Sequence, residues 1–328
     1  MLYASSEPKR EADSVDPQPI RDRSQHLLVI PVFPEFKPLE LADRAAVEAV
    51  VHCFPPYSDF SFTNLYAWRA QVSSLHGNLA VQFADYLWEP PALTFIGHHR
   101  LVETAKQLLA LAKTQCHPAV LRVIPACVAH SLTKAGFSVT EDDAANDYVY
   151  SVKHLASMHE WAGHHVCHSI RQFAARHPNY TIRHAPLHAI DTDEFRALFA
   201  LWAKRKRSTS PQISHEHRAF ERFLRLGDSN IEAVGLYVDS RLIGFSSFEL
   251  MPGDTAIVHF SKTDHAFHSG VGDILNWEEA KHLHARGVTH YNWEQDLGLQ
   301  GLRQSKRKYQ PCNFLRKFTV HAPSGAPE

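Results

Sequence analysis

The chain has 328 residues, of which 44% are hydrophobic, and a formal net charge of −1. This hydrophobic fraction is enough for a packed core, and the length suggests two domains of ordinary size. A net charge this close to zero excludes a global field that attracts nucleic acid or an anionic membrane, so recognition of anions has to be local. No apolar run approaches the ~20 residues of a membrane helix, and the polar first 26 residues lack the apolar core of a signal peptide.

Cysteine and histidine usage gives no sign of a metal centre. The five cysteines show no C-x-x-C spacing, which favours reduced thiols in a cytoplasmic protein. Histidine is abundant, with 24 residues, and His164 and His168 have helical spacing. No H-E-x-x-H or paired-cysteine motif accompanies them, so we expect no metal site.

The first half of the chain alternates short β-type runs with helical patterns. Residues 1–26 are polar and lack apolar periodicity, which predicts a disordered tail. Apolar residues at helical spacing predict helices over 41–53 and 101–113, and the aromatic segment 57–68 predicts a loop that leads into a short helix. Short β-type runs are expected at 79–83, 93–96, 120–124, 137–140 and 148–152.

The second half has a clearer order of elements. A strand at 180–184 and helices at 193–206 and 215–226 come first. Three β-type runs with short connections follow at 233–238, 242–250 and 255–262, which predicts an antiparallel meander. The remaining elements are a helix over 273–286 that ends at Gly287, a strand at 289–294 and a last β-type run at 314–320.

This order is that of the GNAT acyltransferase fold, in which a glycine loop binds the pyrophosphate of the acyl donor. Gly270 and Gly272 keep both glycines of that phosphate loop, and such a loop at a helix N-terminus offers N–H donors to a phosphate. Phe267 stands where the GNAT pattern has a polar residue, and Asp273 would repel a nearby phosphate. These two departures favour a donor other than coenzyme A.

The most informative segment runs from Asn292 to Pro311 and combines acids, glycines and cations. Glu294 and Asp296 come just after a β-type run, and two glycines follow that let the backbone approach a ligand closely. A cationic helix edge comes next. Such a segment can hold an anionic substrate beside a carboxylate that accepts or positions a proton. The alternative is that Asp296 caps the next helix while the cations face solvent.

These features resemble the phosphatidylglycerol lysyltransferase C-terminal-domain-like family, whose members have two fused GNAT-like domains. The resemblance rests on the aromatic segment Tyr57–Trp68, on His259 followed by Lys262, and on a terminal motif. That motif reads Asp296-x-Gly298-x-x-Gly301-Leu-Arg303-x-x-Lys306-x-Lys308-Tyr309-x-Pro311. The chain departs from the family at residues 163–173, where histidines replace most of the cations, and at Ser261, where the family usually has glutamate.

The resemblance implies an α/β (α+β) protein of two fused GNAT-like domains, each a mixed, mostly antiparallel sheet flanked by helices. Residues 27–155 would form the first domain. Residues 156–322 would form the second, which would carry the active site, and residues 1–26 and 323–328 would be tails. A cytoplasmic location is expected, with peripheral attachment to the membrane and the oligomeric state left open.

The resemblance also implies an acyltransferase that moves an aminoacyl group from aminoacyl-tRNA to a lipid or small-molecule acceptor. Catalysis is assigned to Asp296 and Glu294, which would accept the acceptor's proton or bind the donor's ammonium group. The reacting carbonyl would lie near His259 and Lys262. No tightly bound cofactor is expected, since charged tRNA is the co-substrate and partner. The residues assigned to substrate binding are Asn64, His259, Lys262, Gly298, Gly301, Arg303, Lys306, Lys308 and Tyr309.

Two alternatives stay open. The first is an acyl-CoA-dependent GNAT N-acyltransferase that uses the phosphate loop at Gly270 and Gly272. The second is a non-catalytic module on the same fold that binds a nucleotide or another anion. Asp296→Asn would separate an enzyme from a binding module, since an enzyme that uses this carboxylate loses turnover while binding is largely retained.

Overall fold

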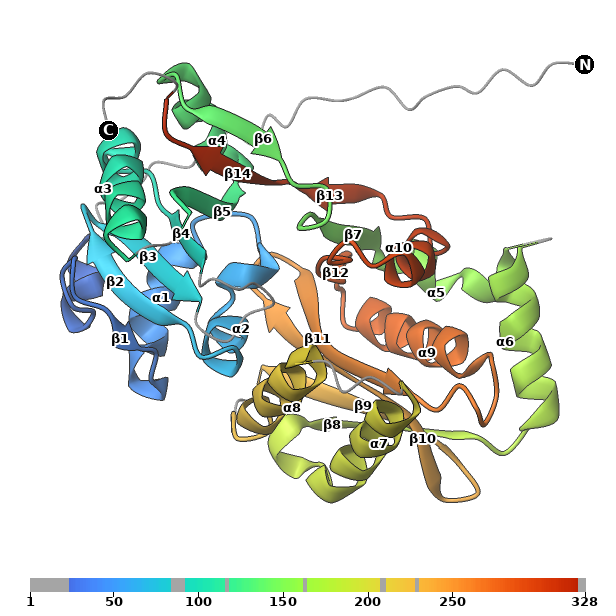
Figure 1. Ribbon diagram of the computed structural model, residues 1–328. Coiled ribbons are helices and arrows are strands. Elements are labelled where there is room, and N and C mark those ends of the chain that lie inside the picture. The colour runs from blue at the N-terminus through green and yellow to red at the C-terminus, as the bar shows by residue number, and fades with distance from the viewer. Residues whose placement is uncertain are drawn as a thin grey trace, which may run out of the picture.

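The computed structural model describes residues 24–83, 92–115, 118–161, 164–206, 211–227 and 230–323. Within these residues the chain forms two seven-stranded mixed sheets with helices packed on them (Figure 1). The predicted tails lie almost entirely outside the described residues. Residues 24–26, the last three of the first predicted tail, instead begin the 3-10 helix Ser24–Val29. Burial of Leu27 holds this helix against the protein.

The first sheet has the strand order β1-β2-β3-β4-β5-β14-β6, with β4 and β5 parallel and the other neighbours antiparallel. The buried residues of helix α3 (Leu101–Thr114) recur at helical spacing, which explains why this segment forms a helix against the sheet. The strands are β1 (Lys37–Pro38), β2 (Gln71–Leu75), β3 (Asn78–Phe83), β4 (Ala92–Ile96), β5 (Val120–Pro125), β6 (Ser138–Glu141) and β14 (Lys317–His321). The helices are α1 (Arg44–Val51), α2 (Phe62–Ala67), α3 (Leu101–Thr114) and α4 (Ala126–Lys134), with the 3-10 helices Leu41–Asp43 and Ser58–Phe60.

The second sheet has the order β13-β7-β12-β11-β10-β9-β8, with β11 and β12 parallel. The predicted meander is confirmed as β9, β10 and β11, which pair antiparallel in sequence order. The strands are β7 (Asp147–Ser151), β8 (Thr181–Pro186), β9 (Ile231–Val238), β10 (Arg241–Met251), β11 (Thr255–Thr263), β12 (His290–Asn292) and β13 (Asn313–Leu315). The helices are α5 (Val152–Ala156), α6 (His165–Arg176), α7 (Thr192–Arg205), α8 (Pro211–Phe223), α9 (Val271–Ala285) and α10 (Gln300–Arg307), with the 3-10 helices Met158–Glu160 and Leu187–Ala189.

The two sheets exchange strands. β7 pairs with β12 and β13 of the second sheet, although it precedes the predicted domain boundary at residue 155. β14 pairs with β5 and β6 of the first sheet, although it lies near the C-terminus. The single β-type run expected at 314–320 is therefore two strands in different sheets, with Arg316 between them. A cut at residue 155 does not separate the two sheets.

The two halves also share a hydrophobic core. Helices α7 and α8 pack on the second sheet through Phe199, Phe220 and Phe223, in the same cluster as Phe62 of α2 in the first half. Helix α9 packs with a separate cluster. Figure 1 shows α2 and α8 facing one another where the halves meet. The aromatic segment expected at 57–68 therefore contributes core packing, and its polar members lie at this junction.

Candidate active site between the two halves

A buried polar cluster lies where α2 meets β10, β11 and the segment after β12. His259 of β11 is at its centre, with Nε2 3.1 Å from Glu249 Oε2 and Nδ1 3.2 Å from Asn64 Oδ1. Asn64 also donates through Nδ2 to Glu294 Oε1 at 2.7 Å, and His259 Nδ1 lies 3.7 Å from that oxygen. We call these four residues the His259 cluster. It brings together three predicted site residues and adds Glu249, which sequence analysis missed.

His259 is charged at neutral pH. Burial by itself would lower its pKa, but hydrogen bonds and charges from Glu249 and Glu294 outweigh burial and raise the pKa to about 9. The imidazolium then donates from both ring nitrogens and cannot act as a base. The side chain of Glu249 is 6% exposed and that of Glu294 is 22% exposed. Glu294 is therefore the carboxylate of the cluster that a ligand can reach.

The backbone around Glu294 is held in an unusual conformation. Its φ of +56° lies in the left-handed region, which costs free energy for a residue with a side chain. Its amide donates to Asn292 Oδ1 at 2.7 Å, and its carbonyl accepts from the Tyr148 amide at 3.0 Å. These bonds fix the strained residue, as is common at functional sites.

Lys306 lies inside the protein and supports this segment. Its ammonium group donates to the carbonyls of Trp293, Glu294 (3.0 Å) and Gln295 (2.7 Å). Burial lowers its pKa to about 8. The predicted role of Lys306 in substrate binding stays a prediction, but its position favours a role in holding the chain after β12.

Asp296 is fully buried, and both of its oxygens are occupied. Arg303 binds it through two nitrogens at 2.7 and 3.1 Å, and the Tyr148 hydroxyl and the Gly298 amide donate at 2.6 and 2.8 Å. Burial by itself would raise its pKa, but the hydrogen bonds from Arg303, Tyr148 and Gly298 outweigh burial and lower the pKa below its usual range. This arrangement favours a structural role over proton transfer, and the catalytic role of Asp296 stays a prediction.

Asp296→Asn is expected to destabilise the protein by about 1–3 kcal/mol, because it removes the charge that the Arg303 guanidinium pairs with. Since folding lowers the pKa of this carboxyl, its contribution is present above the unfolded-state value of about 3.9 and is lost as pH falls through the folded-state value. The stability difference between wild type and variant should therefore shrink below about pH 4. Urea unfolding at neutral and acidic pH measures it. A variant as stable as wild type at pH 7 would contradict the structural role.

The other residues of the terminal motif link α10 to α9. Lys308 Nζ and the Tyr309 hydroxyl both donate to Asp273 Oδ1, at 2.8 and 2.6 Å. Gly301 lies exposed in α10, where a Cβ atom would meet nothing within 4 Å. Asp273, whose carboxylate was expected to repel a phosphate, is thus paired with Lys308 and Tyr309.

The predicted phosphate loop is packed against α6. A Cβ atom on Gly270 would lie 2.8 Å from Ser169 Oγ, so close packing of α6 requires glycine there. The Gly270 amide donates to His268 Nδ1 at 2.9 Å and the Val271 amide to the His268 carbonyl at 3.3 Å. Gly272 has more space, since the nearest atom to a Cβ there lies at 3.7 Å.

Lys262, three residues after His259, joins β11 to α7 and α8. Its ammonium group lies 2.7 Å from Glu216 Oε1 and 4.3 Å from the centre of the Trp202 ring. The structure therefore does not include Lys262 in the His259 cluster.

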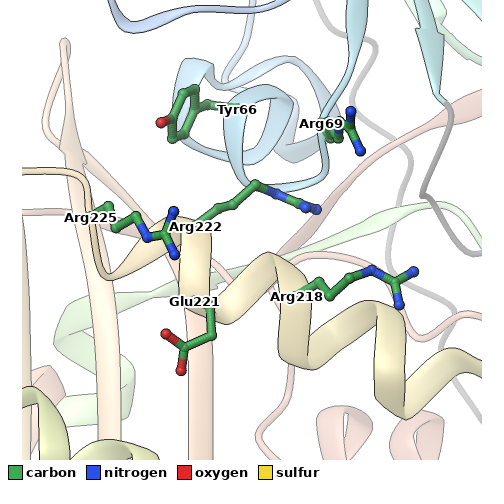
Figure 2. Close-up of a pocket in the computed structure, with 6 residues that line it drawn as sticks. All are labelled: Tyr66, Arg69, Arg218, Glu221, Arg222 and Arg225. Atoms are coloured by element: carbon green, nitrogen blue, oxygen red, sulfur yellow. The ribbon is translucent and has the colours of Figure 1, made fainter.

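A cleft of about 380 Å³ opens between α2 and α8. Figure 2 shows its lining side chains, with Tyr66 and Arg69 on one wall, and residues of α8 and of the turn that follows it on the other. Phe223 at the end of α8 packs on His259, with ring centres 5.8 Å apart, so this wall also borders the His259 cluster. Sequence analysis missed the cleft because its residues come from distant segments. They are Tyr66, Arg69, Arg218, Glu221, Arg222 and Arg225, here called the arginine cleft.

Two further features concern metals and membranes. Among the residues that the structure describes, no group of three or more histidine, cysteine, aspartate or glutamate side chains could hold a metal ion. In the same part of the chain, no helix is both long and apolar enough to cross a bilayer.

Comparison with known proteins places this architecture in a family. No protein of curated function matches the chain. A conserved protein of unknown function from Bacteroides thetaiotaomicron is 23% identical over 89% of this chain and 99% of its own, with a TM-score of 0.74. The C-terminal domain of a putative lysylphosphatidylglycerol synthetase from Agrobacterium fabrum is 12% identical over 85% and 91%, with a TM-score of 0.61. L-PGS from Bacillus licheniformis is 14% identical over 74% and 80%, with a TM-score of 0.51.

At these identities the solved structures show a shared fold, and they confirm the predicted α/β architecture of two mixed sheets flanked by helices. A family model described as phosphatidylglycerol lysyltransferase, C-terminal, matches residues 54–321. The match includes both walls of the arginine cleft and the whole His259 cluster. It confirms the resemblance and supports a GNAT-fold acyltransferase. The chain belongs to the phosphatidylglycerol lysyltransferase C-terminal family.

Proposed function

We propose that the protein transfers an aminoacyl group from aminoacyl-tRNA to a lipid or small-molecule acceptor, with Glu294 as the group that binds the donor's α-ammonium. Membership in a lysyltransferase family supports acyl transfer. The observation that carries the finer proposal is the partly exposed carboxylate of Glu294, fixed by Asn64 and His259 at the junction of the two halves.

The charges of the His259 cluster favour a cationic ligand. One imidazolium faces the two carboxylates of Glu249 and Glu294, so one negative charge is left over within the cluster. Arg44 lies 3.9 Å from Glu249 and is also paired with Glu48 at 3.0 Å. Among the described residues, His259 is the one cation within ion-pair distance of Glu294. Glu294 can therefore accept a charge-assisted hydrogen bond from a second cation.

The proposed reaction is an acyl exchange. The acceptor's hydroxyl or amine attacks the ester carbonyl of the donor and forms a new ester or amide bond. The bond between that carbonyl and the ribose oxygen of the tRNA breaks, and the proton lost by the acceptor ends on the ribose oxygen. Binding of the α-ammonium by Glu294 contributes by orienting the carbonyl for attack.

The alternative donor, acyl-CoA, has less support. Two amides at the start of α9, those of Gly270 and Val271, already donate to His268. The expected phosphate loop therefore offers fewer donors to a pyrophosphate than its glycine pattern suggests.

An aminoacyl nucleoside that cannot react tests this proposal. Adenosine carrying an amide-linked lysyl or alanyl group should bind at least ~10-fold more tightly than the same compound with an acetylated α-amine, because acetylation removes the charge that Glu294 recognises. Isothermal titration calorimetry measures both affinities, and Glu294→Gln should remove the preference. Equal binding of the two compounds by the wild-type protein would contradict the role given to Glu294.

A further inference from the structure

We propose that a row of aromatic side chains at the start of α6 binds a phosphate group and takes up a proton as it does so. Its members are His154, Trp161, His164 and His165, here called the histidine row. The row includes part of the histidine-rich segment 163–173, which the proposed function leaves unused. None of its members belongs to the His259 cluster, and anion binding can be measured without any transfer reaction.

The rings of the histidine row contact one another in chain order. His154 of α5 stacks on Trp161, with ring centres 4.4 Å apart and planes 26° apart. Trp161 meets His164 edge to face, with ring centres 5.2 Å apart and planes at 89°. His164 stacks on His165, with ring centres 4.5 Å apart and planes 27° apart. These contacts hold three imidazoles side by side in fixed positions.

The hydrogen bonds of the imidazoles leave donors for a ligand. His164 Nδ1 accepts from the Val166 amide at 3.3 Å, so the hydrogen of the neutral ring is on Nε2, which can donate to an anion. His165 is exposed, and its side chain makes no hydrogen bond with another described residue. A negative charge beside an imidazole favours its protonated form, so a bound anion stabilises a proton here.

A fixed cation lies beside the row. Burial and the charge of His165 lower the pKa of His164 most, and the charges of Lys308 and His154 lower it further. Lys308 belongs to the segment after α10, and Gln310 of the same segment lies 3.1 Å from His154, between Oε1 and Nε2. The side chain of Lys308 is 27% exposed, so a ligand can reach it. The row and Lys308 together become more positive as pH falls.

The acid beside the row is already occupied. The charge of Asp273 opposes the lowering of the His164 pKa. Its Oδ1, however, accepts from both Lys308 and Tyr309, at 2.8 and 2.6 Å, and its side chain is only 7% exposed. An anion that arrives from solvent therefore meets imidazoles and an ammonium group rather than this carboxylate. The oxygens of a phosphate group can accept charge-assisted hydrogen bonds from several of these donors at once.

The other charged or titratable groups around the row do not change its sign. They are Lys153 of α5, His159 and Glu160 of the next 3-10 helix, His168 and Arg171 of α6, and Lys206, Asp264 and His265 near the start of α9. Glu160 lies 3.4 Å from His159, and Asp264 is paired with Arg205 and Arg241. Burial and then the charge of Lys308 lower the pKa of His265. These carboxylates thus already have partners, and protons added to the row are left for an external anion to balance.

Isothermal titration calorimetry with sulfate, at constant ionic strength set with chloride, tests the proposal on the full chain. Sulfate stands in for phosphate because its own charge does not change over the range in which histidine titrates. Wild-type protein should bind sulfate at least ~10-fold more tightly at about pH 5.5 than at about pH 7.5, because protons are taken up with the anion.

The double variant His164→Asn/His165→Asn should lose this pH dependence. Asparagine is a good N-cap, so α6 should still form, and thermal unfolding at both pH values checks it. The matched control is His98→Asn/His99→Asn, which removes another adjacent pair of rings, 4.3 Å apart, from the first half. The control should bind sulfate as wild type does.

The source of the phosphate group is distinguished at the lower pH. Phosphatidylglycerol vesicles that bind wild-type protein and not the double variant would identify a lipid headgroup. Binding of glycerol phosphate without vesicle binding would identify a soluble phosphate. Sulfate binding that is equal at the two pH values, that the double variant retains, or that is absent from the wild-type protein would overturn the proposal. None of these results bears on Glu294, so the proposed function stands or fails separately.

Discussion

Replacement of Lys317 with methionine is expected to destabilise the protein by about 3–5 kcal/mol, because it leaves two buried carboxylates without their cation. Lys317 is fully buried in β14 and pairs with Asp59 and with Asp147, whose Oδ1 lies 2.5 Å from Nζ. Burial by itself would lower the pKa of Lys317, but the charges of Asp147 and Asp59 outweigh it and raise the pKa. The ammonium group is therefore charged and integral to the fold.

The position of this cluster explains the size of the effect. Lys317 belongs to the first sheet and Asp147 to the second, while Asp59 lies just before α2. Ser58 completes the junction by donating to Asp147 through its amide (2.8 Å) and its hydroxyl (2.6 Å). Loss of the cation should thus loosen the contact between the halves as well as the core.

Urea unfolding measures this destabilisation. The matched control is Arg316→Met, which removes the neighbouring cation. Arg316 is 55% exposed and lies 3.3 Å from Glu141, so its loss should cost at most about 1 kcal/mol. Neutralising both partners in Lys317→Met/Asp59→Asn/Asp147→Asn should recover part of the stability. If Lys317→Met unfolded at the same urea concentration as Arg316→Met, the buried cluster would not hold the halves together.

The second large effect is expected at Glu294. Glu294→Gln should lower kcat/KM for aminoacyl transfer by about 100-fold or more, because it removes the charge that binds the donor's ammonium while an oxygen remains for Asn64. The pKa of His259 should fall from about 9, since one of the two carboxylates that raise it is gone. Initial rates and an NMR titration of His259 measure the two effects independently.

Glu278→Gln is the control for this substitution. Glu278 lies in α9 and accepts from the Tyr180 hydroxyl at 2.6 Å, outside the His259 cluster. The Glu278→Gln variant should keep wild-type turnover. A Glu294→Gln protein with wild-type turnover and an unchanged pKa of His259 would contradict the role proposed for Glu294.

The second half of the fold could be predicted from the sequence because its signals are local. The turn between β9 and β10 contains Asp239 and Ser240, both with positive φ, and Gly253 has a φ of +80° in the next turn. Residues of these types adopt such conformations readily, so the meander was visible as runs with tight connections. Gly287, with a φ of +78°, likewise ends the helical segment where predicted.

The exchange of β7 and β14 between the sheets could not be predicted in this way. Strand pairing depends on hydrogen bonds between segments that are far apart in sequence, and no local pattern records the partner of a strand. β2 and helix α6 were also missed, although the buried residues Val166, Ile170 and Phe173 recur at helical spacing in α6. In α6 the capping residue is His164, whose ring accepts from the Val166 amide, rather than one of the usual small polar residues.

Some residues of the candidate site could be predicted from the sequence, and others could not. Asn64, His259 and Glu294 were all predicted as site residues, and the structure joins them across a sequence separation of up to 230 residues. Glu249 had a signal that was not used, since it is a carboxylate within the otherwise apolar Phe248-Glu249-Leu250 of a buried strand. Lys306 and Lys308, by contrast, were expected to belong to an exposed cationic edge. Lys306 instead donates to backbone carbonyls of residues 293–295, and Lys308 pairs with Asp273. No local pattern in the sequence indicates these partners.

Transfer of label from a charged RNA tests the central claim most directly. Purified protein is incubated with radiolabelled aminoacyl-tRNAs and, separately, with radiolabelled acetyl-CoA, each with lipid and water-soluble fractions of a cell extract. The account predicts that label leaves aminoacyl-tRNA for an acceptor with wild-type protein and not with Glu294→Gln. Label that leaves acetyl-CoA instead, or that leaves tRNA equally well with both proteins, would contradict it.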